Sequence, residues 1–362
     1  MYTRELPMSE EALQPSDPYT AVKQTLAAQQ EQFGTRVVAT ADIDNTTYSH
    51  THADANGSEY TDTLAAFHVP DIRITGIHLP EVAGYINDGK VAAPPAVISS
   101  RNGTMVHIAR PSAAEKHAAG QPISAEDYIE DNDYDALIAS RGFSKRDILT
   151  LAPELFTRIQ ERVPGVWTDF QISDRGENLE TWGMVTDRNM VVYDIEMPAG
   201  TNFVEAEAMI REMATAYYSK HTTFLMESGK AKQAGFEGRA YGYFVLPQGV
   251  GKHTAIEYLI DKLDASVATY VGDHRNDATA LTTVYSRPVY RGIVGGASRE
   301  LHDHIGHHPQ EGRNWRPVVL DQGHRTSLYV EGNGKIGPQS ATQFVREVIN
   351  RQHRRAKVRN SA

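Results

Sequence analysis

Two carboxylates separated by one residue form the strongest chemical signal in the sequence. Asp42 and Asp44 lie in the run DIDNT at 42–46, directly after the apolar segment RVVATA. Carboxylates at the end of a buried strand cost free energy unless they are paired or bind a cation. Mg²⁺ prefers hard oxygen ligands and keeps positions open for water and phosphate. The pair therefore predicts a magnesium site, with an ordinary acidic loop as the alternative.

A second acidic cluster follows another apolar segment. Asp273 and Asp277 lie in the run GDHRND at 272–277, after SVATYV at 266–271, and Asn276 stands between them. If both segments are strands of one parallel sheet, their carboxyl ends meet at the same edge. The two clusters would then converge, although Asp, Asn and Gly also form common turns.

Lys252 and the pair Thr75-Gly76 are candidate phosphate ligands. Lys252 follows QGVG at 248–251 and begins a helical pattern, so its ammonium group and the helix N-terminus would both favour an anion. Thr75 and Gly76 end the segment DIRI and offer a hydroxyl and a flexible amide to phosphate oxygens. A solvated lysine and a plain loop are the alternatives.

The elements that must position these residues alternate between strands and helices. Apolar segments at 36–42, 71–76 and 95–100 are typical of buried parallel strands, and the same pattern resumes after Pro247. Between them, helical stretches at 126–140 and 146–163 precede a hairpin around 187–189, an amphipathic helix and two further strands. We expect an α/β protein whose parallel sheet is interrupted by an inserted α+β domain.

These patterns divide the chain into four parts. We expect an N-terminal leader at 1–34, a core formed by 35–109 and 246–335, an inserted domain at 110–245, and a C-terminal helix with a basic tail at 336–362. The tail is either a solvated helix or a contact to anionic groups. Its basic residues are Arg346, Arg351, Arg354, Arg355, Lys357 and Arg359.

Composition excludes several classes of function. The 362 residues are 40% hydrophobic and carry 36 basic against 46 acidic side chains, so a net charge of −10 argues against a nucleic-acid partner. The absence of cysteine excludes disulfides, thiolate zinc sites and thiol catalysis. Neither a secretory signal nor a membrane-spanning run is visible, so we expect a cytoplasmic protein without a membrane partner.

The joint order of the motifs, an Asp pair, Thr, Lys and a second Asp pair, resembles the haloacid-dehalogenase-like (HAD) hydrolase superfamily. The resemblance covers 36–110 and 247–300, and the segment between them stands where the family has its cap. The mixed texture of that segment is similar to the large α/β cap of the sugar-phosphate phosphatase branch. Asn45 and the run NGT at 102–104 are most similar to sucrose-phosphatase-like members. The resemblance implies a Rossmann-like core.

The resemblance also implies roles for the acidic residues. Asp42 would be the nucleophile that forms an aspartyl-phosphate, and Asp44 would be the general acid and then the base. Asp42, the backbone carbonyl of Asp44, and Asp273 would bind Mg²⁺ as the cofactor. Asp277 would complete the metal site or orient Lys252.

The remaining roles concern the substrate. Lys252 and Thr75 would bind the transferring phosphoryl group, with Ser99 or Ser100 replacing Thr75 if that motif is misplaced. Ile77 motivates this alternative, because many sugar phosphatases have arginine there. Further substrate contacts are expected from Thr46, Gly76, Asn102 and Asn276.

Other clusters carry weaker expectations. The histidine-rich run HDHIGHH at 302–308 could bind a transition metal, but it lacks a regular ligand spacing and is better explained as a polar surface segment. His50 and His52 belong to a polar loop with a possible substrate contact. Trp167 and Trp182 are expected in the core of the insertion rather than as platforms for a sugar.

We therefore expect a Mg²⁺-dependent phosphatase that hydrolyses a small phosphomonoester, with a phosphorylated sugar as the substrate. A sugar phosphomutase and a catalytically weak sugar-phosphate-binding protein are the alternatives. The sequence predicts no particular oligomeric state.

Overall fold

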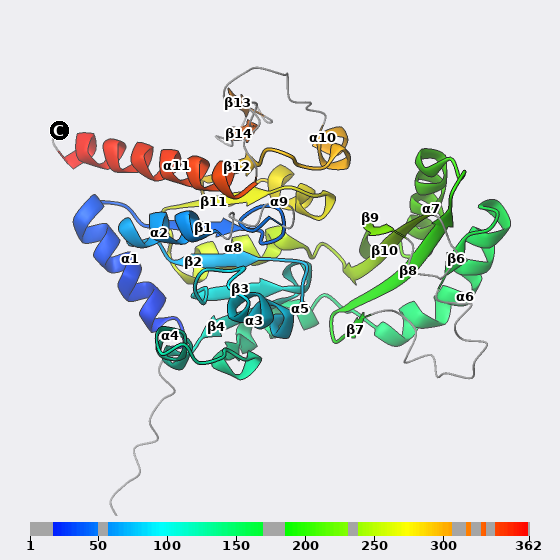
Figure 1. The fold of residues 1–362 in the computed structure, drawn as a ribbon, viewed down its shortest axis with the longest axis horizontal. Helices are drawn as coiled ribbons and strands as arrows, with labels where there is room; N and C mark the ends of the chain where they lie inside the picture. Colours follow the sequence, from blue (N-terminus) through cyan, green and yellow to red (C-terminus); the bar gives the residue numbers. More distant parts are fainter. Residues whose placement is uncertain are drawn as a thin grey trace, which may run out of the picture.

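A computed structural model describes residues 17–49, 57–168, 185–230, 238–305, 316–319, 327–330 and 337–360. Its two β-sheets are separate, and each has its own buried cluster of apolar side chains. Figure 1 shows the smaller sheet, with helices α6 and α7, to one side of the larger one. In the described part of the chain, no helix combines the length and apolar character that crossing a bilayer requires.

The larger sheet has nine strands in the order β13-β14-β12-β11-β1-β2-β3-β4-β5. Its six neighbouring strands from β14 to β3 are parallel, as the apolar segments predicted, whereas β4, β5 and β13 pair antiparallel. The bounds are β1 Val37–Ala41, β2 Asp71–Ile74, β3 Val97–Ser100, β4 Met105–Ala109, β5 Tyr128–Glu130, β11 Val267–Gly272, β12 Val289–Ile293, β13 Arg316–Val319 and β14 Ser327–Val330.

Helices cover both faces of this sheet. Because successive side chains of a strand point to opposite faces, Val38 of β1 packs in a cluster with α5 and α8, while Val37 and Ala39 pack with α2 and α11. The helices are α1 Thr20–Phe33, α2 Ser58–Ala66, α3 Leu79–Asn87, α4 Pro111–Ala118, α5 Asn132–Ala139, α8 Lys252–Lys262, α9 Ala278–Thr282, α10 Arg299–Ile305 and α11 Gly337–Asn360, with the short 3-10 turns η1 Arg101–Gly103, η2 Ala125–Asp127 and η6 Arg275–Asp277.

The smaller sheet has the order β6-β8-β10-β9, with β7 also paired to β8, and its pairs are antiparallel. The predicted hairpin is present between β7 and β8, and the amphipathic helix α7 buries Ala206 and Ile210 against the sheet. The bounds are α6 Lys145–Arg162, β6 Trp167–Thr168, β7 Val185–Asp187, β8 Met190–Pro198, α7 Phe203–Tyr217, β9 His221–Lys230 and β10 Gly238–Pro247.

One expected boundary is wrong. The insertion was expected to begin at residue 110, with one helix over 126–140. Instead, β5 pairs with β4 in the larger sheet, and Tyr134 and Ile138 of α5 belong to its core cluster. Strand β5 and helix α5 therefore belong to the domain of the larger sheet and not to the insertion. The pairing of β5 with β4 outweighs the local helical pattern at 128–130.

Both ends of the described chain pack on the larger sheet. Tyr19 and Leu26, beside and within α1, are buried in its core cluster, and the ring of Phe33 stacks on His353 of α11 at 3.9 Å. The expected C-terminal helix is α11, which extends to Asn360 and so includes the residues of the basic tail. Figure 1 shows that α1 and α11 run at an angle to each other and meet near the C-terminal part of α11.

Candidate active site

Asp42 lies immediately after β1, at the carboxyl edge of the parallel strands. Its amide donates to the carbonyl of Val271 at 2.9 Å, which extends the pairing of β1 with β11 by one residue. The side chain is 4% exposed, and its Oδ1 lies 3.0 Å from Lys252 Nζ. Burial outweighs the attraction of Lys252 and raises the pKa of Asp42 to about 7.

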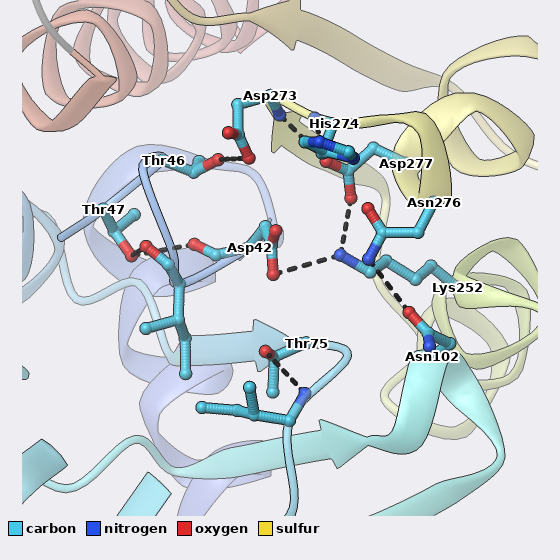
Figure 2. A network of polar contacts seen from close by, with 12 residues as sticks. Asp42, Thr46, Thr47, Thr75, Asn102, Lys252, Asp273, His274, Asn276 and Asp277 are labelled. Atoms are coloured by element: carbon cyan, nitrogen blue, oxygen red, sulfur yellow. Dashed lines mark hydrogen bonds and ion pairs between the residues drawn. The ribbon is translucent and has the colours of Figure 1, made fainter. Parts of the chain in front are cut away.

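Lys252, the first residue of α8, lies between two carboxylates (Figure 2). It is 0% exposed, and its Nζ donates to Asp277 Oδ1 at 2.6 Å. Burial opposes the ammonium charge, but the carboxylates of Asp277 and Asp42 outweigh burial and raise the pKa of Lys252. The side chain is therefore a fixed cation beside Asp42.

Asp277 accepts four hydrogen bonds. Lys252 and the Tyr270 hydroxyl donate to Oδ1, while the amides of Asp273 and His274 donate to Oδ2 at 2.8 and 2.9 Å. Burial favours the neutral acid, but Lys252 and these donors lower the pKa of Asp277. Because two donors occupy each oxygen, the geometry favours Asp277 as the residue that orients Lys252 over a role as metal ligand.

Three carboxylates gather at this edge. One oxygen each of Asp42, Asp273 and Asp277 lies within 4.8 Å of the others. Asp273 Oδ1 accepts a hydrogen bond from Thr46 Oγ1 at 3.0 Å. Burial, and then the charges of Asp277 and Asp42, raise the pKa of Asp273 well above its usual value. An all-oxygen group in which charge is this costly fits a divalent cation such as Mg²⁺, with Asp42 and Asp273 as the available side chains.

Asp44 lies outside the group of three carboxylates. It is half-buried, and the Tyr85 hydroxyl of α3 forms a hydrogen bond with it. The chain turns at Asn45, directly after Asp44, with a φ of 52°, and Thr47 Oγ1 donates to the Asp42 carbonyl at 2.8 Å. The Asp44 carboxylate is thus held separately from the other acids.

Thr75 lies at the end of β2 and faces the same site. Its amide donates to the Ser99 carbonyl at 2.8 Å, and Figure 2 shows its hydroxyl pointing toward the space between Asp42 and Lys252. The alternative residue Ser100 instead pairs its Oγ with His107 Nε2 of β4 at 3.1 Å. The geometry therefore favours Thr75 at this position.

Asn102 and Asn276 join the second and fourth motifs. Asn276 Nδ2 donates to Asn102 Oδ1 at 2.9 Å, and a Cβ on Gly76 would lie 3.0 Å from that oxygen. Gly76 thus leaves room for the amide pair. Asn102 Nδ2 and Asn276 Oδ1 are buried without a hydrogen-bond partner in the described part of the chain, so both are available to a ligand.

Comparisons with known proteins identify the fold. No family model matches the sequence, and no curated protein matches it. Among solved structures, the sucrose-phosphatase of Synechocystis sp. PCC6803, in complex with sucrose and phosphate, is 15% identical with a TM-score of 0.51, over 88% of this chain and 98% of that one. A haloacid dehalogenase-like hydrolase protein from Bacillus subtilis is 16% identical with a TM-score of 0.48, over 90% and 99%.

The chain shares the fold of that sucrose-phosphatase. The predicted α/β fold class is therefore confirmed, and the shared fold agrees with the sucrose-phosphatase-like resemblance of the sequence. The four motifs lie where this fold would bring them together, after β1, after β2, at the start of α8 and after β11.

Three residues of the candidate site were missed by sequence reasoning. Tyr270 lies in the apolar run of β11, and Tyr85 lies in α3, far in sequence from Asp44. Gly103 has φ 86°, and a Cβ there would lie 2.3 Å from the Gly251 carbonyl oxygen, so the η1 backbone abuts the start of α8. Only the glycine of the run NGT offered a signal, because glycine often marks a close backbone approach.

The histidine-rich run and the basic tail lie apart from the three carboxylates of the candidate site, Asp42, Asp273 and Asp277. His302 is buried in α10 and His304 lies in the same helix, and the metal-type group among the described residues contains no histidine. In the basic tail, Arg346 pairs with Glu59 at 3.2 Å, and Arg351 pairs with Glu347. Five residues that carried predictions lie outside the described residues, namely His50, His52, Trp182, His307 and His308, and the side chain of Trp167 is not described either.

Proposed function

We propose that this protein is a Mg²⁺-dependent phosphatase that hydrolyses a small phosphomonoester through an aspartyl-phosphate on Asp42. The observation that supports it most is the position of Asp42, whose buried Oδ1 lies 3.0 Å from the Lys252 ammonium and within 4.8 Å of an Asp273 oxygen. A carboxylate beside a fixed cation and a second acid is suited to attack on an anionic phosphoryl group.

Asp42 and Asp273 would hold the metal, together with the backbone carbonyl of Asp44. Asp42 Oδ1 is buried and forms an ion pair with Lys252 at 3.0 Å, and burial raises the pKa of both Asp42 and Asp273. Bound Mg²⁺ would offset the negative charge of the carboxylates and of the phosphoryl group.

In the first step an Asp42 oxygen attacks phosphorus while the bond from phosphorus to the leaving oxygen breaks. Lys252, held by Asp277 and Asp42, stabilises the charge on the phosphoryl oxygens without giving up its proton. Asp44, protonated, donates a proton to the leaving alcohol. Its hydrogen bond with Tyr85 fixes the position of this acid.

In the second step a water molecule attacks phosphorus and the bond from phosphorus to Asp42 breaks. Asp44, now ionised, accepts the proton of that water, so the acid returns to its starting state. The Thr75 hydroxyl, the Gly76 amide and the free Asn102 Nδ2 would bind phosphoryl oxygens. The free Asn276 Oδ1 would accept a hydrogen bond from a substrate hydroxyl, and Thr46 would support Asp273.

The smaller sheet would act as a cap that selects the substrate. A cavity of about 1040 Å³ lies between α7, β9 and β10 of that sheet and the loop that follows Asp273. Similarity in fold to a sucrose-phosphatase supports a phosphorylated sugar as the substrate class.

Phosphate release from a panel of sugar phosphates and p-nitrophenyl phosphate, with and without Mg²⁺, tests this proposal. We expect metal-dependent release that Asp42→Asn abolishes. Release that persists in Asp42→Asn, or transfer of phosphate between hydroxyls with no free phosphate, would contradict it, and the second result would indicate a mutase.

A further inference from the structure

The cavity between the two sheets has charged walls. The cap side contributes Glu207, Arg211, Glu227 and Arg239, and the core side contributes residues of the 273–277 loop and of α10. Strand β9 contacts η6, so the cavity borders the loop that carries Asp273 and Asp277.

Three of the four arginines in the cavity wall are paired with carboxylates. These pairs are Arg239 with Glu227 at 3.0 Å, Arg211 with Glu207 at 3.6 Å, and Arg299 with Asp303 at 3.6 Å.

Arg275 is the exception. In the described part of the chain it has neither a hydrogen bond nor an ion pair, although it is only half-exposed and lies between His274 and Asn276. Burial, and then the charge of Arg211, lower the pKa of Arg275, and Glu300 offsets this only in part. A half-buried guanidinium without a partner is costly.

Glu300 does not neutralise Arg275 by contact. Its Oε2 lies 3.9 Å from Arg211 Nη2 and is buried without a hydrogen-bond partner among the described residues. Burial, and then the charge of Glu207, raise the pKa of Glu300. Among the described residues, Arg275 is therefore the one arginine of the cavity wall without a salt bridge, and it lies in the active-site loop itself.

We propose that Arg275 binds a carboxylate on the part of the substrate that does not react, so that acidic sugar phosphates are preferred over neutral ones. The inference rests on the proposed phosphatase function and narrows its substrate class. A guanidinium donates two parallel hydrogen bonds to a carboxylate. Because Arg275 is the one unpaired arginine among the described residues of this wall, and the wall also contains four acids, a monoanion fits this position better than a second phosphate.

Matched substrates test this directly. Glucose 1-phosphate and glucuronic acid 1-phosphate differ only in a hydroxymethyl group against a carboxylate, and glycerol 3-phosphate and 3-phosphoglycerate differ in the same way. We would measure their binding to Asp42→Asn protein by calorimetry with Mg²⁺ present, and their hydrolysis by the unmodified protein. We expect the acidic member of at least one pair to bind about tenfold more tightly, since a hydrogen bond to a charged group contributes this much.

The variant Arg275→Gln should abolish that preference and leave the binding of the neutral member within about twofold. Arg299→Gln is the matched control, because Arg299 lines the same cavity but is 90% exposed and paired with Asp303. The proposal is overturned if neither pair shows a preference for the acid, or if the preference survives Arg275→Gln.

The two proposals fail in different ways. Hydrolysis of neither member of a pair, with the acidic preference present in binding, would contradict the phosphatase function and support the carboxylate site. Hydrolysis of both members at equal efficiency, with equal binding, would support the phosphatase and overturn the role of Arg275.

Discussion

Lys252 Nζ lies 2.6 Å from Asp277 Oδ1, and both side chains are fully buried. The pair is the fixed part of the site, because Asp277 also receives the Tyr270 hydroxyl and two backbone amides. Lys252 is thereby held 3.0 Å from Asp42, where a charge would act on an incoming phosphoryl group.

Asp277→Asn should lower both stability and activity. The asparagine would present an NH₂ group to donors that now meet an oxygen, so the free energy of unfolding should fall by about 3 kcal/mol and kcat/KM by about 100-fold. Urea unfolding and phosphate release measure the two effects. Asp88→Asn, at the exposed pair with Lys90, is the control and should change stability by about 1 kcal/mol or less. Unchanged activity in Asp277→Asn would refute its orienting role.

Tyr270→Phe should reduce activity with little loss of packing. The variant removes one donor from Asp277 and leaves the ring in place, which should lower kcat about tenfold. Tyr60→Phe is a close control, because the Tyr60 hydroxyl is also buried but has no hydrogen-bond partner in the described part of the chain. If both variants have the same kcat, the Tyr270 hydroxyl is irrelevant to the site.

Mg²⁺ affinity should fall as the pH is lowered through about 7. Burial raises the pKa of Asp42 to about 7 in the metal-free protein, so below that pH a proton occupies the carboxylate and must be displaced by the metal. Above about pH 7 the Asp42 carboxylate is already ionised, so its titration should no longer change the Mg²⁺ affinity. Calorimetric titration of Mg²⁺ between about pH 5.5 and about pH 8.5 measures the trend. An affinity that does not change over this range would show that Asp42 is not a ligand.

Gly103→Ala should displace the start of α8. A Cβ at this position would lie 2.3 Å from the Gly251 carbonyl oxygen, next to Lys252. Gly120→Ala is the matched control, because Gly120 also has a positive φ, 66°, but no atom lies within 4 Å of the added Cβ. The control variant therefore has the backbone strain of an alanine at positive φ without a steric clash. We expect the control to cost about 1 kcal/mol of stability and keep its kcat, and Gly103→Ala to lose both more stability and most of its activity. Equal effects would mean that the contact with α8 is unimportant.

Much of the larger sheet could be predicted, because its central strands are continuous apolar runs that end in polar turns. The segment at 266–271 became β11 at Val267–Gly272, and the segment at 71–76 became β2 at Asp71–Ile74. Strand β5 could not be predicted, since its three residues fall within a stretch with a helical pattern and only the pairing with β4 makes them a strand.

Some contacts of the candidate site could also be predicted from the sequence, and others could not. The proximity of Asp42 to Asp273 could be predicted, because β1 and β11 are neighbouring parallel strands and an acid follows each of them. The hydrogen bond from Tyr270 to Asp277 does not follow, because a tyrosine within an apolar strand ordinarily indicates core packing. The position of Arg275 does not follow either, because its lack of a partner in the described part of the chain depends on how α7 and α10 are placed around it.

The most direct test of the account is to trap the phosphorylated intermediate. Rapid quenching during turnover, reduction of the acyl phosphate with borohydride, and mass spectrometry of the peptides would convert a phosphorylated aspartate into homoserine. We predict homoserine at position 42 and at no other aspartate, with none in protein lacking substrate. Full turnover with an unmodified Asp42 peptide, or homoserine at another residue, would contradict the central claim that Asp42 is the nucleophile.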